Sequence, residues 1–242
     1  MDNEKNSKLI AFGAFGLILG VSIIISSTII SRTFLDVKKL DNVISVSGSA
    51  KQKVAADSAR WTGSFSRSVL KDQLKDGYAN MKNDEKTVND YFKSRGFKVE
   101  ISPVFMNEIY KNDQNAPKEY NLIQNIEIKS TEVEKMKELA KSSDQLAALG
   151  ILFSANSVEY YYSKLPELRV SLLPEAIKDA KARADSIALS SNKLVDAVKS
   201  VTMGVVQVMP VGSIDVSDYG SYDTSSIDKE VMITVKTVFS LK

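Results

Sequence analysis

The sequence predicts an α+β domain of antiparallel strands and hairpins packed with about three helices, preceded by one N-terminal transmembrane helix. Strand-like and helix-like segments follow one another in the order ββ-α-ββ and then α-β-α-ββ, unlike the regular βαβα of a doubly wound fold. A separate uncharged run, Leu9 to Ser31, lies near the N-terminus. The 242 residues, 43% of them hydrophobic, are enough for a sizeable core.

The run from Leu9 to Ser31 has the length of a membrane span. As a helix it extends roughly 34 Å at about 1.5 Å per residue, slightly more than the ~30 Å hydrocarbon core of a bilayer. A soluble helix normally keeps one polar face, which this run lacks. A cleavable signal peptide is the alternative, but its apolar region is usually shorter and its cleavage site resembles A-x-A. We expect an N-terminal tail at 1–8, an uncleaved anchor at 9–31 and a polar tether at 32–42.

Charges flanking the span do not decide its orientation, because lysines precede it and Arg32, Lys38 and Lys39 follow it. A large domain after a single N-terminal span usually lies outside. The sequence therefore predicts a single-pass inner-membrane protein whose C-terminal domain lies in the periplasm or outside the cell. Within the span, Gly16 and Gly20 form a GxxxG motif, which allows two helix backbones to approach closely. Chance is an equal explanation, since glycine is common in membrane helices.

Beyond the tether, hydrophobic periodicity predicts the secondary structure of one domain at 43–242. Strands are expected at 43–53, 59–68, 99–110, 119–129, 151–163, 201–209 and 230–241. Helices are expected at 71–94, 131–148 and from Pro166 or Leu168 to Ser190. The polar segment 111–117 predicts a hairpin connection.

Local motifs refine these elements. The first two strands are expected to pair as a hairpin, with Asp57 bonding backbone amides of the turn. Thr131 and Glu134 have the spacing of a capping box at a helix start. Gly96 is expected to end the first helix of the domain with a positive φ.

The chain has no cysteine and no histidine. These absences exclude a cysteine nucleophile, a Ser-His-Asp triad and the usual ligand sets of zinc, copper and haem. The 32 basic and 30 acidic residues nearly cancel, and no basic patch is interleaved with aromatic residues. We therefore expect no enzyme activity, no cofactor, no metal site and no nucleic-acid partner.

The segment 212–228 is polar, rich in Gly and Ser, and contains four aspartates. Clustered carboxylates could bind calcium, but their spacing is not that of an EF-hand, and a solvated loop is the better explanation. Tyrosine is favoured at interfaces, so its two tyrosines are candidate contact residues. The candidate interaction loop comprises Asp215, Asp218, Tyr219, Tyr222 and Asp223, with Asp228 as the fourth aspartate.

Two catalytic interpretations are weaker. Asp57 and Glu108 could form the carboxylate pair of a glycoside hydrolase, which needs the two groups roughly 5–10 Å apart. Ser-x-x-Lys occurs at Ser68–Lys71 and at Ser190–Lys193, but no K-T-G partner accompanies either. We assign no catalytic residue.

Several short motifs resemble the SIMPL domain, a bacterial extracytoplasmic family. The first is Ile44-x-Val46-x-Gly48 followed by Val54-x-x-Asp57-x-Ala59. The second is an alanine-rich helix with Lys181 and Ile187, whose alanines recur at Ala176, Ala180, Ala184 and Ala188. The third is the C-terminal strand that ends Val238-Phe239-Ser240-Leu241.

Two positions depart from the family's pattern. Ala56 stands where the family prefers proline, and Asn192 stands where a glycine usually follows the alanine-rich helix. Asparagine also tolerates the left-handed conformation that a helix end requires. Neither departure argues against the fold.

The resemblance implies an α+β domain at a membrane or in the periplasm, a tendency to assemble into rings, and a link to envelope stress. It implies no established reaction. We therefore expect a non-enzymatic, self-associating, membrane-anchored scaffold. The alternative is a binding module for a glycan, peptide or metal that uses a cleft or the 212–228 loop.

Overall fold

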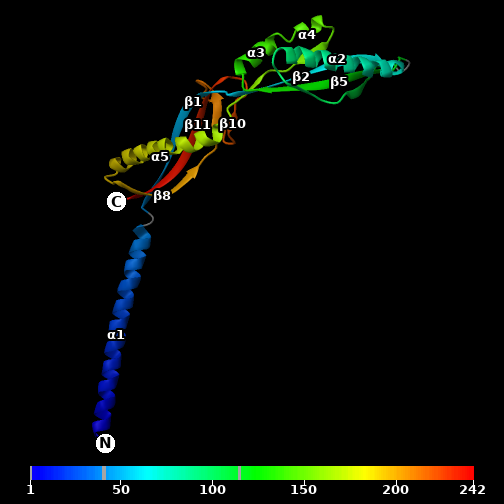
Figure 1. The fold of residues 1–242 in the computed structure, drawn as a ribbon. Coiled ribbons are helices and arrows are strands. Elements are labelled where there is room, and N and C mark those ends of the chain that lie inside the picture. Colours follow the sequence, from blue (N-terminus) through cyan, green and yellow to red (C-terminus); the bar gives the residue numbers. More distant parts are fainter. Residues whose placement is uncertain (1, 40–41, 114–115) are drawn as a thin grey trace. The chain divides into compact units, whose positions relative to one another are not determined.

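The computed structural model describes residues 2–39, 42–113 and 116–242, and the chain forms two units (Figure 1). The first unit contains Met1–Ser49, Glu175–Met203 and Val235–Lys242, and the second contains Ala50–Pro174 and Gly204–Thr234. Three elements contribute residues to both units: strand β1 (Val43–Ala55), helix α5 (Leu165–Ser190) and strand β11 (Asp228–Leu241).

The N-terminal apolar run forms part of one helix, α1 (Asp2–Lys39). Its stretch Phe15–Leu35 has a mean hydropathy of 1.8 and is not buried, so it is long and apolar enough to cross a membrane. Polar side chains within it, such as Ser22 and Thr28, donate hydrogen bonds to carbonyls of the preceding turn, at 2.8 Å each. They therefore need no partner in lipid. The helix continues to Lys39, through most of the expected tether, and residues 40 and 41 lie outside the described residues.

A six-stranded antiparallel sheet forms the centre of the second unit. Its strand order is β3-β5-β2-β6, with β4 on β5 and β7 on β2. The strands are β2 (Ser58–Leu70), β3 (Val99–Ile101), β4 (Phe105–Ile109), β5 (Glu119–Ser130), β6 (Leu152–Ala155) and β7 (Glu159–Tyr161). Antiparallel pairing of β4 with β5 confirms the hairpin expected across 111–117.

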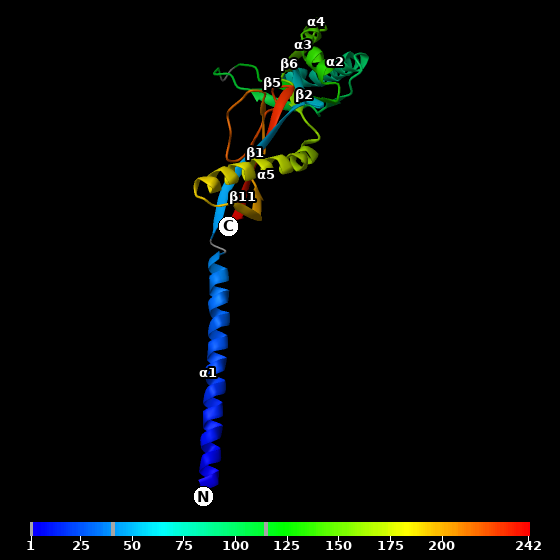
Figure 2. The ribbon, with the colours of Figure 1, turned by 90° about the vertical axis from the view of Figure 1, so that its left-hand side faces the viewer.

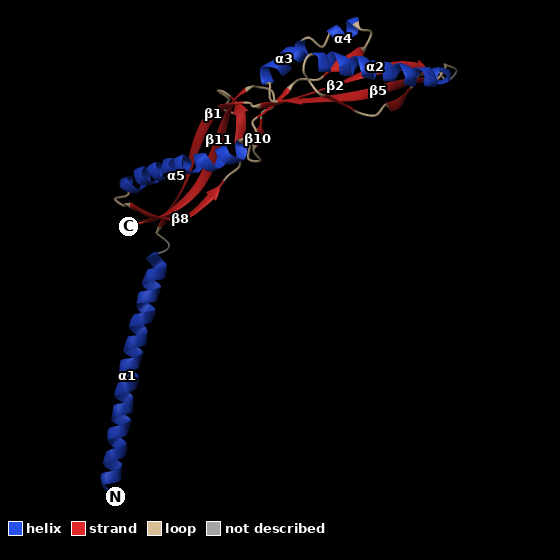
Figure 3. Cartoon of the chain, in the orientation of Figure 1, coloured by secondary structure: helices blue, strands red, loops and turns tan. Residues whose placement is uncertain are grey.

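Alternation along β2 produces the core of this unit. Ala59, Trp61 and Phe65 point to one face and are buried, so the residues between them point to the other face. The buried face packs against α2 (Leu74–Ser94) and α3 (Val133–Lys141), which lie along β2 (Figure 3). Two short helices adjoin these elements, the 3₁₀ helix η1 (Lys71–Gln73), which contacts α2, and α4 (Gln145–Ala148), which contacts β6.

Close packing of a helix on a sheet defines the first unit. Here α5 crosses β1 and β11 (Figure 2), and β11 pairs with β8 (Val195–Met203). The four alanines of α5 that recur every four residues are at most 2% exposed: Ala176, Ala180, Ala184 and Ala188. This alanine face therefore packs in the core. The second sheet has the order β1-β11-β9-β10, and its remaining strands, β9 (Gln207–Pro210) and β10 (Ser221–Tyr222), belong to the second unit.

The expected β1–β2 hairpin is wrong. Strand β1 lies next to β11, whereas β2 uses both of its edges for β5 and for β6 with β7. Asp57 accepts hydrogen bonds from the backbone N–H and the hydroxyl of Ser163, at 2.8 and 2.7 Å, rather than from amides of its own turn. The Ala56 N–H donates to the Ile227 carbonyl at 2.8 Å, a bond that proline could not make.

Helix ends follow the expectations in part. Gly96 (φ 85°) and Asn192 (φ 54°) adopt the left-handed conformation predicted for them. The capping box is wrong, because α3 begins at Val133 and no side chain caps it. Instead, the Ser130 hydroxyl accepts the Glu132 N–H at 3.0 Å, before the helix begins.

Candidate functional site

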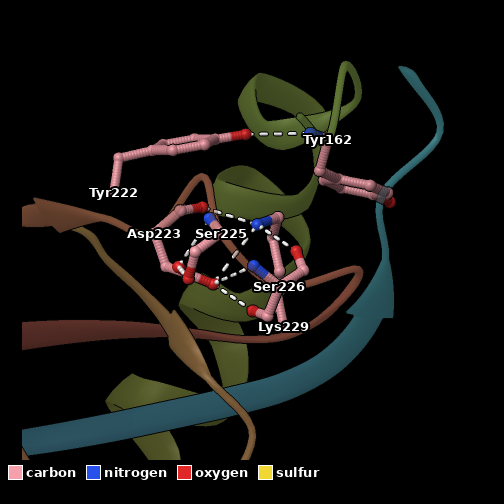
Figure 4. Close-up of polar contacts among 6 residues, drawn as sticks. All are labelled: Tyr162, Tyr222, Asp223, Ser225, Ser226 and Lys229. Atoms are coloured by element: carbon pink, nitrogen blue, oxygen red, sulfur yellow. Dashed lines mark hydrogen bonds and ion pairs between the residues drawn. The ribbon is translucent and has the colours of Figure 1, made fainter. Parts of the chain in front are cut away.

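The segment between β9 and β11 has two parts with different environments. Its base comprises Tyr222, Asp223, Ser225, Ser226 and the first residues of β11, including Lys229 (Figure 4). Its tip runs from Val211 to Tyr219 and is mostly exposed.

Lys229 is the centre of the base. Its side chain is fully buried, and its ammonium donates to the carbonyls of Asp223 at 2.5 Å and Ser226 at 2.6 Å. The Asp223 carboxylate lies 3.4 Å away. A buried ammonium is costly unless it is paired and hydrogen-bonded, and these three acceptors meet that requirement.

The Asp223 carboxylate is itself enclosed by donors. The Ser225 N–H and hydroxyl donate to it at 2.9 and 2.6 Å, and the Ser226 hydroxyl also bonds to it. Burial alone raises the pKa of this carboxyl, but the bonds from Ser225 and Ser226 and the charge of Lys229 outweigh burial and lower it. Burial also lowers the pKa of Lys229, and Asp223 opposes that shift.

Tyr222 is fixed to the base, although it is 38% exposed. Its hydroxyl accepts the Tyr162 N–H at 2.8 Å (Figure 4). Its ring also lies 5.9 Å from the ring of Tyr161. Two of the predicted contact residues, Tyr222 and Asp223, therefore hold the loop in place.

Gln207 fixes the remainder of the loop. Gln207 is only 4% exposed, and its side-chain amide nitrogen donates to the Ser217 carbonyl at 2.5 Å. Its oxygen accepts the Ser221 hydroxyl at 2.8 Å. The C-terminal end of the tip is thus attached to Gln207, the first residue of β9.

The tip presents apolar side chains to solvent. Ile214 is 91% exposed, Val216 64% and Tyr219 97%. Asp215 and Asp218 lie in the same tip, but no three acidic residues gather into a metal site anywhere in the described ranges. Of the five predicted loop residues, Asp215, Asp218 and Tyr219 are exposed in the tip, and Tyr222 is 38% exposed in the base.

The residues of the two catalytic interpretations have other partners or lie in different elements. Asp57 bonds Ser163, whereas Glu108 pairs with Lys118 at 3.0 Å, so the structure gives the two carboxylates separate partners. Ser68 lies in β2 and Lys71 in η1, so this Ser-x-x-Lys does not lie on one helical turn.

On α1, a Cβ added at Gly16 or Gly20 would meet nothing within 4 Å. The association of two such helices stays a prediction.

The sequence matches one family model over residues 44–239, that of SIMPL, described as a protein of unknown function (DUF541). No curated protein matches the chain. The match covers the second unit and most of the part of the first unit that follows α1.

Proposed function

Because the chain belongs to the SIMPL family, we propose that it is a membrane-anchored extracytoplasmic scaffold that self-associates, without enzymatic activity, into a ring or similar assembly connected with envelope stress. The observation that carries this proposal is strand β8. It pairs with β11, and among the described strands it has no neighbour on its other edge.

One face of β8 lacks the cover that β11 has. Val198, Val201 and Met203 stand opposite Phe239, Thr237 and Val235 in the register. The three β11 residues are at most 1% exposed, whereas the three β8 residues are 50, 41 and 39% exposed. Facing positions in neighbouring strands share a face of the sheet, so an apolar surface continues from the core of the first unit into solvent.

A second copy of the chain is the partner that this strand fits. An unpaired edge with apolar side chains pairs readily with another strand, and natural proteins usually protect such edges. The anchor α1 would hold many copies in one membrane, which raises their effective concentration. Gly16 and Gly20 would add a second contact between copies within the membrane.

We expect charged residues introduced on the exposed apolar face of β8 to weaken the association of the copies. Full-length chain in mild detergent at micromolar concentration should sediment as an oligomer, and Val198→Lys/Val201→Lys should weaken association at least tenfold. Val170→Lys serves as the control, because Val170 is 66% exposed and lies on α5 rather than on β8. A wild-type chain that is strictly monomeric would refute self-association.

The exposed tip supports a second function, in which the loop binds a peptide through apolar contacts. Deletion of 216–226 would not test it, because the deletion removes Asp223 and both serines around Lys229. We expect peptides selected on the full-length chain to bind at least tenfold more weakly to Ile214→Ser/Val216→Ser/Tyr219→Ser, without a change in melting temperature. Leu149→Ser, at an exposed apolar residue outside the tip (54%), should leave binding intact. Equal affinity for the triple variant would exclude the tip as the binding surface.

A further inference from the structure

We propose that the six-stranded sheet binds an acidic saccharide, with a sugar ring in a hollow on the face opposite α2 and α3 and its carboxylate or phosphate in a second hollow at the adjoining end of the sheet, where α2 ends and α3 begins. The two hollows share the side chain of Arg60. This inference is independent of self-association, since every residue that carries it belongs to the second unit.

Strand alternation makes this face polar. In β5 the buried residues Leu122, Gln124, Ile126 and Ile128 point to the core, so the alternate residues, among them Asn125 and Glu127, point the other way. Cross-strand register then places Asn125 opposite Ser64, and Ser64 opposite Ser154. The result is a surface of hydroxyl, amide and charged groups.

The first hollow has a volume of about 530 Å³, which is within the usual range for small-ligand sites. Its polar lining includes Thr62, Glu100, Ser102, Asn125 and Glu127. Within the described residues, the side chains of Asn125 and Glu100 have no hydrogen-bond or ion-pair partner. An amide offers two donors and an acceptor, and a carboxylate offers two acceptors, which suits neighbouring sugar hydroxyls.

The second hollow adjoins the first at Arg60 and has a volume of about 820 Å³. Three cationic side chains line it, Arg60, Lys98 and Lys129, against one carboxylate, Glu132. That carboxylate is already paired with Lys135. In the described part of the chain, Lys98 has no ion-pair partner, so its charge is available to an anion.

An ionic network holds the boundary between the hollows in one geometry. Arg60 donates two hydrogen bonds to Glu127, at 2.8 and 2.6 Å, and one to Glu159 at 3.4 Å. Lys129 also pairs with Glu127. Hydrogen bonds from Lys129 and Arg60 lower the pKa of Glu127, so it remains a carboxylate at neutral pH.

Acidic saccharide is the ligand class that uses both hollows. A neutral sugar would leave the Lys98 ammonium of the second hollow, which has no ion-pair partner within the described residues, without an anion. A small anion without hydroxyls would leave the free amide and carboxylate of the first hollow unused. A sugar acid or sugar phosphate of two or three rings supplies hydroxyls and the anionic group on one molecule.

The test uses full-length chain in detergent on an array of uronate, sugar-phosphate and neutral oligosaccharides, followed by titration with digalacturonate and α-1,4-galactobiose, which differ only in their carboxylates. We expect uronates or sugar phosphates to bind at least tenfold more tightly than their neutral counterparts. Lys98→Ala should lower affinity for the acidic ligand to that for the neutral one. Asn125→Ala should weaken both by at least fivefold.

Matched controls lie on the exposed surface of α2: Lys82→Ala and Asn83→Ala should change neither affinity. Three results would overturn the proposal. The first is an array on which no acidic saccharide binds, and the second is equal binding of acidic and neutral sugars. The third is complete competition by citrate at the concentration of the saccharide, which would indicate a site for free anions.

Discussion

Replacing Gly48 with alanine is expected to destabilise the protein by about 3 kcal/mol, at the upper end of the usual cost of overpacking a core. A Cβ at this position would lie 2.3 Å from the Ala176 carbonyl oxygen and 2.3 Å from the Ala180 backbone nitrogen. Both atoms belong to the backbone of α5, so no rotation of a side chain can relieve the clash. The helix must move away from β1, and its buried alanine face loses contacts with the sheet.

Thermal unfolding of the full-length chain in detergent, followed by circular dichroism, measures this effect. At this chain length the expected loss corresponds to roughly 6–12 °C in Tm. Ser47→Ala is the matched control, since Ser47 is the exposed neighbour of Gly48 on β1 and alanine replaces it without new contacts. If Gly48→Ala and Ser47→Ala melted at the same temperature, the close approach of α5 to β1 would be disproved.

The sequence predicts this region well because its signals are local. Alanine every four residues predicts a helix face that can approach another backbone, and Gly48 alternates with Val46 on a strand. Positive φ at Gly96 and Asn192 follows in the same way from the requirements of a helix end. Each prediction depends only on residues within a turn or two.

Strand partners are harder to predict, because pairing joins residues far apart in the chain. The sequence 44–59 is equally compatible with a hairpin and with two strands in different sheets. Two long-range contacts decide between these arrangements: the Ala56 N–H donates to the Ile227 carbonyl, and Asp57 accepts a hydrogen bond from Ser163. Neither residue can be identified from the segment itself.

The candidate loop shows a similar limit. Its aspartates suggested an exposed cluster, yet Asp223 is enclosed by Ser225, Ser226 and Lys229. One signal was present in the sequence. Lys229, Val231 and Ile233 lie at alternate positions of β11 and are all buried, so their side chains point to the same face. A lysine that alternates with apolar residues along a strand predicts a buried charge, and a buried charge requires a partner nearby.

The partnership of Lys229 with Asp223 leads to the second large effect. We expect Lys229→Met to destabilise the protein by about 3–5 kcal/mol, because it leaves the enclosed Asp223 carboxylate without its cation. Asp223→Asn should be comparably harmful, since it leaves a buried ammonium without a counterion. Urea denaturation at pH 7 measures both, with Lys181→Met as a control whose exposed pair to Asp185 contributes only about 0.3–0.5 kcal/mol.

The double variant Lys229→Met/Asp223→Asn separates pairing from packing. If the two charges stabilise each other, the double variant will lose less stability than the sum of the single losses, by about 1–3 kcal/mol. Additive losses would mean that each side chain acts through its own packing and hydrogen bonds. The geometry favours coupling, because the carboxylate lies 3.4 Å from the ammonium and both groups lie in the same buried base.

Acid provides an independent measure of the same pair. The pKa of Asp223 is lower in the folded protein than the ~3.9 of an unfolded aspartate, so its ionised form contributes stability that is fully present above that value. This contribution disappears as the pH falls through the folded pKa. Lys229 has the opposite sign: its folded pKa is lowered, so its charge costs stability at neutral pH, and the cost disappears only as the pH rises through the folded pKa toward ~10.4. The difference in unfolding free energy between wild type and Asp223→Asn should therefore persist at pH 5 and shrink as the pH falls below ~3.9. A difference that vanished already at pH 5 would show that Asp223 is protonated in the folded protein and does not hold the loop as a carboxylate.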